Sequence, residues 1–558
     1  MGGGEQPERG PTADAAMAPL PPPSTVPALL DAAVARFPGQ PAIDFMGRRW
    51  TYAALGALVD RAASGLQRIG VVKGTRVGLC LPNTPYSVIL YFAALKAGAI
   101  VVNYNPLYVE RELLTQIRDS GTTIMVVPDL PAIHGKVGRV AAEAGLARII
   151  VCPIAAMLPT LHCLAYHLIR WRERTHADPL NLSFTRLIGS KTPLTPVAID
   201  PERDVAVLQY TGGTTGIPKG AMLTHANLTA NSAQVIAQAA TLRPGDERVL
   251  GVLPLFHVFA MTCVMNCGIA LGAEIVLLPR FEIRQLMRTI ARTRPSVFPA
   301  VPTIYGAINT AAEHMRIDLT SIRYCTSGGA PLPTEVAQRF EQLTGGSLTE
   351  GYGLSETSPV VCFTPPGRER KPGSVGPAVP GTVIEIRDPS DPARKLGVGE
   401  KGEICIRGPQ VMLGYWNRAE ATREALFEGA LRTGDIGYLD ADNYLFLVDR
   451  IKDVILCGGY NVYPRVLEEA LYQHEAVAEV VVIGIPDPYR GQSPKAFVTL
   501  RPGRSVNPEA LRDFLKGYVS PIELPKEIEI RTSLPKTMIG KLSKKALEDE
   551  LAQKGDQA

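Results

Sequence analysis

The sequence predicts an α/β protein with parallel sheets covered by helices. Short β-branched runs such as RVGLCLP (76–82) and RIIVC (148–152) alternate with segments of helical period over most of the chain. Within 281–293, apolar residues recur at i, i+3, i+4 and i+7, which is the stripe of a helix packed on a sheet. This alternation is typical of βαβ units, whose parallel strands are buried by their crossover helices.

The same pattern locates further strands. In the last third of the chain, this alternation of strands and helices is replaced by other patterns. Strand-like runs also occupy 122–127, 205–210, 249–255, 273–279, 296–301 and 323–328. From about Gly397 such runs follow one another closely, and after Lys452 helical and strand patterns mix. A helix is expected to open at Asn507-Pro508, where a capping residue precedes a proline at the first helical position.

These changes predict three parts. Residues 25–450 are expected to form an N-terminal domain, and 451–558 a smaller α+β domain. Residues 1–24 are expected to be a disordered tail, since they are rich in Gly, Pro and Ala and lack the pattern of a signal peptide.

Composition narrows the class of protein. With 558 residues, 46% of them apolar and 20% charged, the chain is neither a collagen, a coiled coil nor a disordered protein. A net charge of +4 is too small over this length to indicate a nucleic-acid binder. Nine scattered cysteines show no disulfide or zinc spacing, which favours a reducing cytoplasm. The apolar stretch 258–273 is too short to span a bilayer.

One amphipathic segment, 157–174, has two interpretations. Its apolar residues and the arginines at 170, 172 and 174 could place it in a membrane interface, with Trp171 at the boundary. It could equally be a helix that covers the core or an insertion.

The motif YTGGTTGIPKGAMLTH (210–225) is the strongest chemical signal. It directly follows a predicted strand, and its glycines let backbone approach an anion closely while its threonines add donors. The residues expected to cradle a polyphosphate are Thr211, Gly212, Gly213, Thr214, Thr215, Gly216 and Lys219. The loop is not a Walker A motif, because Pro218 and Gly220 flank the lysine.

This loop resembles the phosphate loop of the adenylate-forming acyl-CoA synthetases. Further motifs of that family follow in order at 254–260, 327–332, 351–357, 432–440, 449–464 and 535–541. The resemblance covers nearly the whole chain and is strongest to bacterial medium- and long-chain fatty-acyl-CoA synthetases. It implies a large N-terminal domain of helix-covered parallel sheets plus a distorted β-barrel, with a small mobile α+β C-terminal domain.

The resemblance also implies a nucleotide site. Tyr352 would stack on adenine, Glu356 would hold Mg²⁺, and Asp435 with Arg450 would bind the ribose. Gly329 and Ala330 would line the adenine pocket with backbone, Thr357 would contact the nucleotide, and His257 would lie near the substrate carboxylate.

Two further implied roles concern the C-terminal domain. Lys541 would bridge the carboxylate and the α-phosphate, two anions that repel each other. The domain would rotate about Lys452 between the two half-reactions, and Gly458 and Gly459 would then lie against coenzyme A. ATP, Mg²⁺ and coenzyme A are therefore the expected cofactors, and the oligomeric state, including a dimer, is left open.

The expected reaction is AMP-forming ligation of a medium- or long-chain fatty acid to coenzyme A. Gly353 stands where acetate-specific relatives carry a bulky aromatic, and 105–121 and 428–453 resemble fatty-acyl-CoA synthetases. Ala430 departs from the tryptophan usual in the fatty-acid signature. The alternatives are an aryl or 4-coumarate-type CoA ligase, a fatty-acyl-AMP ligase that loads a carrier protein, a luciferase-like oxygenase, and an inactive membrane-associated binding protein.

Overall fold

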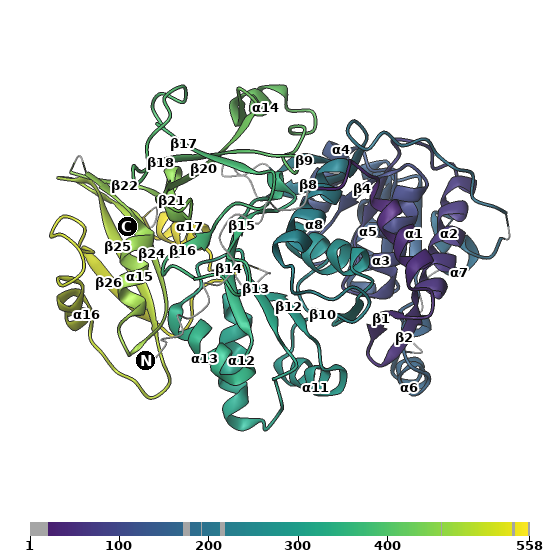
Figure 1. Ribbon diagram of the computed structural model, residues 1–558, viewed down its shortest axis with the longest axis horizontal. Coiled ribbons are helices and arrows are strands. Elements are labelled where there is room, and N and C mark those ends of the chain that lie inside the picture. The colour runs from purple at the N-terminus through teal and green to yellow at the C-terminus, as the bar shows by residue number, and fades with distance from the viewer. Residues whose placement is uncertain are drawn as a thin grey trace, which may run out of the picture.

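The computed structural model describes residues 20–170, 179–190, 192–211, 218–458, 460–537 and 542–555. Its strands form four sheets, and the chain runs from an N-terminal helical and sheet region at one end of the molecule to a C-terminal region at the other (Figure 1). The expected disorder of 1–24 falls mainly outside the described residues, and 20–25 contain no helix or strand.

The first sheet has seven strands. In spatial order they are β7 (Asn181–Ser183), β6 (Arg148–Cys152), β5 (Ile124–Pro128), β3 (Arg76–Leu79), β4 (Ile100–Asn103), β8 (Val205–Thr211) and β9 (Lys219–Thr224). The helical segments in this stretch of chain are α3 (Pro85–Lys96), α4 (Glu110–Ser120), α5 (Pro131–Ala144), η1 (Ile154–Met157), α6 (Thr160–Arg170) and α7 (Phe184–Leu187). Nearly every residue of α3 is buried, which explains its continuous apolar sequence.

The second sheet has eight strands. In spatial order they are β15 (Val360–Phe363), β14 (Ser347–Gly353), β13 (Tyr324–Ser327), β12 (Val297–Ala300), β10 (Arg248–Gly251), β11 (Glu274–Leu277), β1 (Pro41–Phe45) and β2 (Arg48–Thr51). The helical segments of these stretches are α1 (Val26–Arg36), α2 (Tyr52–Arg68), α8 (His225–Gln238), α9 (Val258–Ala260), η2 (Met261–Asn266), α10 (Cys267–Ala270), α11 (Ile283–Thr293), α12 (Pro302–His314), α13 (Thr334–Thr344) and η3 (Ser355–Thr357).

Two further sheets complete the molecule. The third contains β16 (Ser374–Gly376), β21 (Leu445–Arg450), β20 (Ala430–Leu439), β18 (Gly402–Arg407) and β17 (Val383–Arg387), with β19 (Leu426–Phe427) on β20 and α14 (Ala419–Ala425) beside it. After η4 (Ile451–Asp453), the fourth contains β23 (Tyr460–Val462), β22 (Ile455–Cys457), β25 (Gly491–Leu500), β24 (Val477–Asp487) and β26 (Glu527–Arg531). Its helices are α15 (Pro464–Tyr472), α16 (Pro508–Leu515) and α17 (Lys544–Gly555).

The parallel arrangement predicted from the βαβ rhythm is confirmed for the central strands of both large sheets. It does not extend to both edges of the eight-stranded sheet, where β1–β2 and β14–β15 pair antiparallel, or to one edge of the seven-stranded sheet, where β8–β9 do. Short connections cause this difference. In β1–β2, Met46 and Gly47 both have positive φ, the backbone of a two-residue hairpin turn.

Several local predictions are confirmed. The stripe in 281–293 is α11, where Leu286, Met287 and Ile290 are buried. At the start of α16, the Asn507 side chain accepts a hydrogen bond from the backbone of Ala510 at 2.7 Å. Among the described residues, none of the helices has the length and apolar content needed to cross a bilayer.

Candidate active site

One cavity, of about 2350 Å³, lies where the large N-terminal part meets the C-terminal sheet. Its walls combine the carboxyl ends of parallel strands with residues from the third and fourth sheets. The carboxyl ends of β12, β13 and β14 contribute Val301, Gly328 and Gly353. A crevice outside the carboxyl ends of parallel strands is the usual ligand position in open α/β sheets.

The phosphate-loop motif enters this cavity on a hairpin. Thr211 and Lys219 are paired across β8 and β9, two adjacent strands that the chain joins through 212–218. Both Thr211 and Lys219 line the cavity. The predicted Gly212, Gly213, Thr214, Thr215 and Gly216 lie outside the described residues.

The residues predicted to hold adenine and ribose are brought together. Asp435 and Arg450 are paired across β20 and β21, and Arg450 Nε lies 3.3 Å from Asp435 Oδ1. The Tyr352 hydroxyl donates to Asp435 Oδ2 at 2.6 Å. Burial, together with the nearby Asp435 carboxylate, raises the pKa of Tyr352 well above its ordinary value, so the hydroxyl remains a donor.

Backbone completes this part of the wall. Gly329 and Ala330 line the cavity, as predicted for an adenine pocket. Gly329 has φ of +81°, a conformation that disfavours any other residue and brings the peptide to the cavity surface.

Of the remaining predicted residues in the N-terminal part, two face the cavity and one does not. Glu356 and His257 line it, and His257 Nδ1 accepts from the backbone of Phe259 at 3.3 Å. Thr357 is fully buried, and its hydroxyl donates to the carbonyl of Leu354 and accepts from the backbone N–H of the same residue, each at 3.0 Å. The structure thus places Thr357 in the turn behind Glu356 instead of on the cavity wall.

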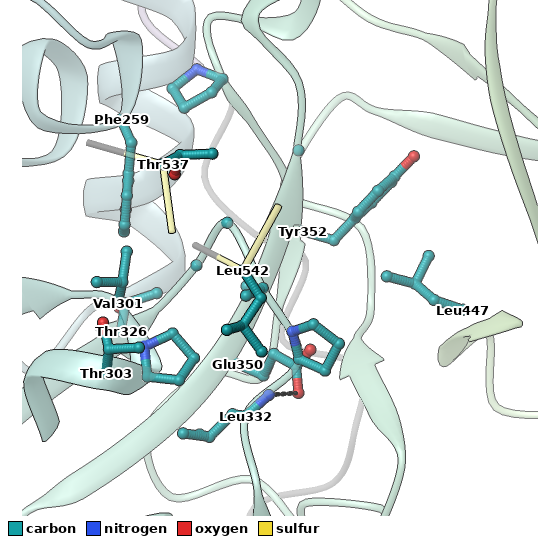
Figure 2. Close-up of a pocket in the computed structure, with 18 of the residues that line it drawn as sticks. Phe259, Val301, Thr303, Thr326, Leu332, Glu350, Tyr352, Leu447, Thr537 and Leu542 are labelled. Carbon is teal, nitrogen blue, oxygen red and sulfur yellow. Dashed lines mark hydrogen bonds between the residues drawn. The ribbon is translucent and has the colours of Figure 1, made fainter. Parts of the chain in front are cut away.

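The C-terminal residues divide in a similar way. Lys452 lines the cavity from η4. Gly458 is not among the cavity-lining residues, and Gly459 and Lys541 lie outside the described residues. Thr537 and Leu542, which flank the segment that contains Lys541, point into the same cavity as Phe259 and Tyr352 (Figure 2).

Part of the cavity wall is apolar, and we call this part the apolar arm. It is lined by side chains of α8, β10, η2, α10, β12, β13 and β15, among them Val235, Ile236, Leu242, Val249, Cys263, Cys267, Leu271, Val297, Tyr324 and Phe363. These residues are also part of, or packed against, the main hydrophobic core. This apolar wall suits contact with an apolar ligand.

The structure also shows cavity residues that sequence reasoning missed. The Tyr415 hydroxyl donates to Glu356 Oε1 at 2.8 Å, and Lys219 Nζ lies 5.2 Å from the centre of its ring. Glu350 joins the two parts of the molecule, because Arg465 Nη2 of α15 lies 3.7 Å from its Oε1. The sequence signal for both was position: Glu350 precedes the motif 351–357, and Tyr415 lies in a GYW triplet close to a predicted strand.

Burial raises the pKa of Glu350 to about 7, and the positive charge of Arg465 partly opposes this rise. The backbone N–H of Leu332 also donates to Glu350 at 3.3 Å (Figure 2). This carboxyl group therefore changes charge near neutral pH at the contact between the two parts.

Together the fold and the cavity define a two-part α/β enzyme with a nucleotide-sized site between its parts. The chain belongs to the AMP-binding enzyme family. Residues 30–416 match the AMP-binding enzyme model, and residues 466–541 match the AMP-binding enzyme C-terminal domain.

Individual relatives are similar over nearly the full length. A long-chain-fatty-acid–CoA ligase of Bacillus subtilis (strain 168) is 42% identical over 536 residues, 95% of each chain. A 4-coumarate–CoA ligase of Humulus lupulus is 33% identical over 90% of this chain and 89% of that protein. ATP-bound MatB from Rhodopseudomonas palustris aligns with a TM-score of 0.82 at 26% identity, over 94% of this chain and 99% of that one. The apo form of MatB aligns with a TM-score of 0.72 at 27% identity over the same shares.

AMP-forming CoA ligases use ATP, Mg²⁺ and coenzyme A, and the cavity fits the first two. Asp435 is 9% exposed and already engaged by two side chains, which suits an acceptor fixed for a ribose. Glu356 offers one carboxylate beside the phosphate-loop hairpin, and Mg²⁺ is commonly held by one or two carboxylates plus substrate phosphates. Mg²⁺ bound there would neutralise phosphate charge.

Proposed function

We propose that this protein is an AMP-forming fatty-acid–CoA ligase for medium- or long-chain acids. In the first half-reaction, a carboxylate oxygen attacks the α-phosphorus of ATP, giving acyl-AMP and releasing pyrophosphate. In the second, the thiol of coenzyme A attacks the acyl carbon, loses its proton and displaces AMP, giving acyl-CoA.

One observation supports this proposal above the others: a single cavity unites the three chemical environments that the first half-reaction needs. The phosphate-loop hairpin with Lys219, the pair Asp435–Arg450 and the apolar arm all line it. Its volume of about 2350 Å³ exceeds the roughly 300–1,000 Å³ of an ordinary ligand pocket. That size accommodates a nucleotide together with an acyl chain.

The roles of individual residues are part of the proposal. Lys541 would approach the carboxylate and α-phosphate, and the positions of Thr537 and Leu542 in the cavity support this. His257, at the entrance to α9, would orient the carboxylate. Lys219 would contact the outer phosphates as a point charge.

The present arrangement of the two parts favours the adenylation half-reaction. The chain aligns better with ATP-bound MatB than with apo MatB. Gly458 lies away from the cavity, which is expected if its face serves coenzyme A only after the C-terminal part has rotated.

Gly353 and Ala430 carry little information about the length of the acyl chain. A Cβ atom at Gly353 would lie 1.8 Å from the carbonyl oxygen of Pro359, so this position requires glycine whatever the acid. Ala430 is fully buried at the start of β20 and is not among the residues lining the cavity. The apolar arm is therefore the main support for a long chain.

The decisive experiment is carboxylate-dependent exchange of pyrophosphate into ATP, followed by coenzyme A thioester formation. Saturated acids from acetate to an eighteen-carbon chain would be compared with benzoate and 4-coumarate. We expect exchange to rise with chain length up to medium or long acids, because each buried CH₂ contributes about 0.8 kcal/mol. A best response to an aryl acid would contradict the substrate but not the chemistry, and acyl-AMP without thioester would indicate a carrier-loading ligase.

Peripheral contact with a membrane, from a cytoplasmic location, is a further part of the proposal. In α6, Leu161 is 80% exposed and Leu164 is 59% exposed, while Cys163 and Tyr166 pack partly against the core. Leu161 and Leu164 therefore face outward, as apolar residues of an interfacial helix would.

Vesicles of anionic phospholipid test this contact. Leu161→Ser with Leu164→Ser should lower the fraction of protein that sediments with the vesicles several-fold. Leu107→Ser is a matched control, since Leu107 is 67% exposed but lies outside α6. Equal sedimentation of the α6 variant and the control would contradict the contact.

A further inference from the structure

We propose that Tyr415 is a positioning residue that holds Glu356 in place as a ligand for the divalent cation bound with ATP. This inference rests on the proposed function, which assigns Glu356 to the cation. Tyr415 lies outside the motifs discussed above. Its side chain contacts both groups expected to serve the triphosphate, the Glu356 carboxylate and the Lys219 ammonium.

The first support is the contact itself. The Tyr415 hydroxyl donates to Oε1 of Glu356 at 2.8 Å, and both side chains line the cavity. Mg²⁺ demands near-ideal octahedral geometry and tolerates little movement of its ligands. A hydroxyl fixed on one carboxylate oxygen restricts rotation of the carboxylate and orients the other oxygen.

The second support is that the backbone holds Tyr415 firmly. It forms a β-bridge with Ala221 of β9, and the next residue, Trp416, donates its N–H to the carbonyl of Gly220 at 2.8 Å. The backbone of Met412 donates to the carbonyl of Glu356 at 2.8 Å. The segment 412–416 is thus attached both to the phosphate-loop hairpin and to Glu356 itself.

The third support is the position of Lys219. Its ammonium lies 5.2 Å from the centre of the Tyr415 ring, within the range of a cation–π interaction. The Tyr415 ring therefore contacts Lys219, which is expected to bind the phosphates. Its hydroxyl contacts Glu356, which is expected to bind the metal. Tyr415 fixes the distance between these opposite charges.

Hydrogen-bond partners of metal ligands commonly matter 10–100-fold for metal affinity. Tyr415→Phe would remove only the hydroxyl and keep the ring beside Lys219. Because the carboxylate would lose one restraint without losing its charge, we expect the preference of the protein for metal-loaded nucleotide to fall by about tenfold.

The experiment compares the dissociation constants of a non-hydrolysable ATP analogue with and without saturating Mn²⁺, measured calorimetrically on the full chain. In Tyr415→Phe, the dissociation constant without Mn²⁺ divided by the dissociation constant with Mn²⁺ should fall by about tenfold, because binding of the metal-loaded analogue weakens more. A purely structural role would weaken both forms equally and leave the ratio unchanged. The half-saturating Mg²⁺ concentration in pyrophosphate exchange should rise by a similar factor, with the KM for the fatty acid unchanged.

Tyr210→Phe is the matched control. The Tyr210 hydroxyl also donates to a carboxylate, Asp119 Oδ2 at 2.6 Å, and Tyr210 lies on β8 in the hairpin itself, but its bond does not reach Glu356. Its Mn²⁺ ratio should stay within about twofold of the wild type. The same shift in both variants would overturn the proposal, since it would indicate general loosening of the hairpin.

A double variant completes the test. In Glu356→Gln the metal preference should already be lost, and adding Tyr415→Phe should change it no further. Additive effects would overturn the role of Tyr415 through Glu356. The binding ratio remains informative even if no acid supports exchange, so failure of the proposed function and failure of this inference can be told apart.

Discussion

At the scale of single residues, the nucleoside end of the cavity is organised by Asp435. Its carboxylate lies between the Tyr352 hydroxyl and the Arg450 guanidinium, and neither partner follows it closely in sequence. Hydrogen bonds to charged groups contribute more than neutral ones, about 1.5–3 kcal/mol each. The proposed ribose acceptor is therefore oriented before any nucleotide arrives.

Gly353 is a second residue whose role depends on its surroundings. Gly353→Ala should lower the free energy of unfolding by about 2 kcal/mol, because the new Cβ would lie 1.8 Å from the Pro359 carbonyl oxygen and force the strands apart. Chemical denaturation would measure the change. Gly306→Ala is the control, since Gly306 also lines the cavity but its Cβ would meet nothing within 4 Å in α12. Its stability should be unchanged or higher.

At the scale of elements, β14 and α15 are joined by an ion pair. Glu350 on β14 meets Arg465 on α15, and a second pair, Glu335 on α13 with Arg501 just after β25, also joins the N-terminal and C-terminal parts. Arg465 is also held within its own helix, by Glu469 at 2.8 Å. The position of the C-terminal part is thus stabilised partly by groups that can lose their charge.

The raised pKa of Glu350 gives this contact a pH dependence. Because the folded pKa, about 7, is above the ordinary value of 4.5, the folded protein binds this proton more tightly than the unfolded chain does. The stabilisation of the folded state by protonated Glu350 is complete below pH 4.5 and is lost as pH rises through about 7. Glu350→Gln should therefore raise Tm relative to the wild type more at pH 8 than at pH 5.

Thermal unfolding between pH 5 and pH 8 would check this. Glu335→Gln is the matched control, because Glu335 is exposed and pairs with Arg501 between the same two parts of the molecule. Its difference in Tm from the wild type should not vary over this window. A Glu350→Gln difference that is equally constant would show that Glu350 does not titrate there.

At the scale of the whole molecule, one cavity serves two half-reactions that need different surroundings. Adenylation requires exclusion of water, whereas thioester formation must admit coenzyme A. The present arrangement brings Thr537 and Leu542 to the cavity and leaves Gly458 outside it. Rotation about the η4 segment would exchange these two faces.

Two variants should separate the half-reactions. Lys541→Ala should slow acyl-AMP formation by about 10²–10³-fold, by analogy with the loss of one transition-state donor, yet still convert supplied acyl-AMP with coenzyme A. Lys452→Pro should do the reverse, because proline restricts the backbone at the proposed hinge. Pyrophosphate exchange and thioester formation from supplied acyl-AMP measure the two steps. Equal loss of both steps in both variants would contradict a rotating C-terminal part.

The sequence by itself determined the repeating elements and proposed the reactive residues. The period of α11 and the cap of α16 depend on neighbours within a few residues, so their patterns predicted them correctly. Most of the predicted site residues that the structure describes line the cavity, because their chemistry is carried by residue types at short spacing. Thr357 and Gly458 do not line it, and the Thr357 hydroxyl turns into its own backbone.

Only the tertiary structure decided which distant residues meet. The bond from Tyr415 to Glu356 joins residues 59 positions apart, and the contact of Glu350 with Arg465 joins residues 115 positions apart. The antiparallel edge β1–β2 depends on the backbone of a turn. The apolar arm likewise collects side chains from seven elements. Such contacts are set by the packing of whole sheets and helices, and no local pattern in the chain encodes them.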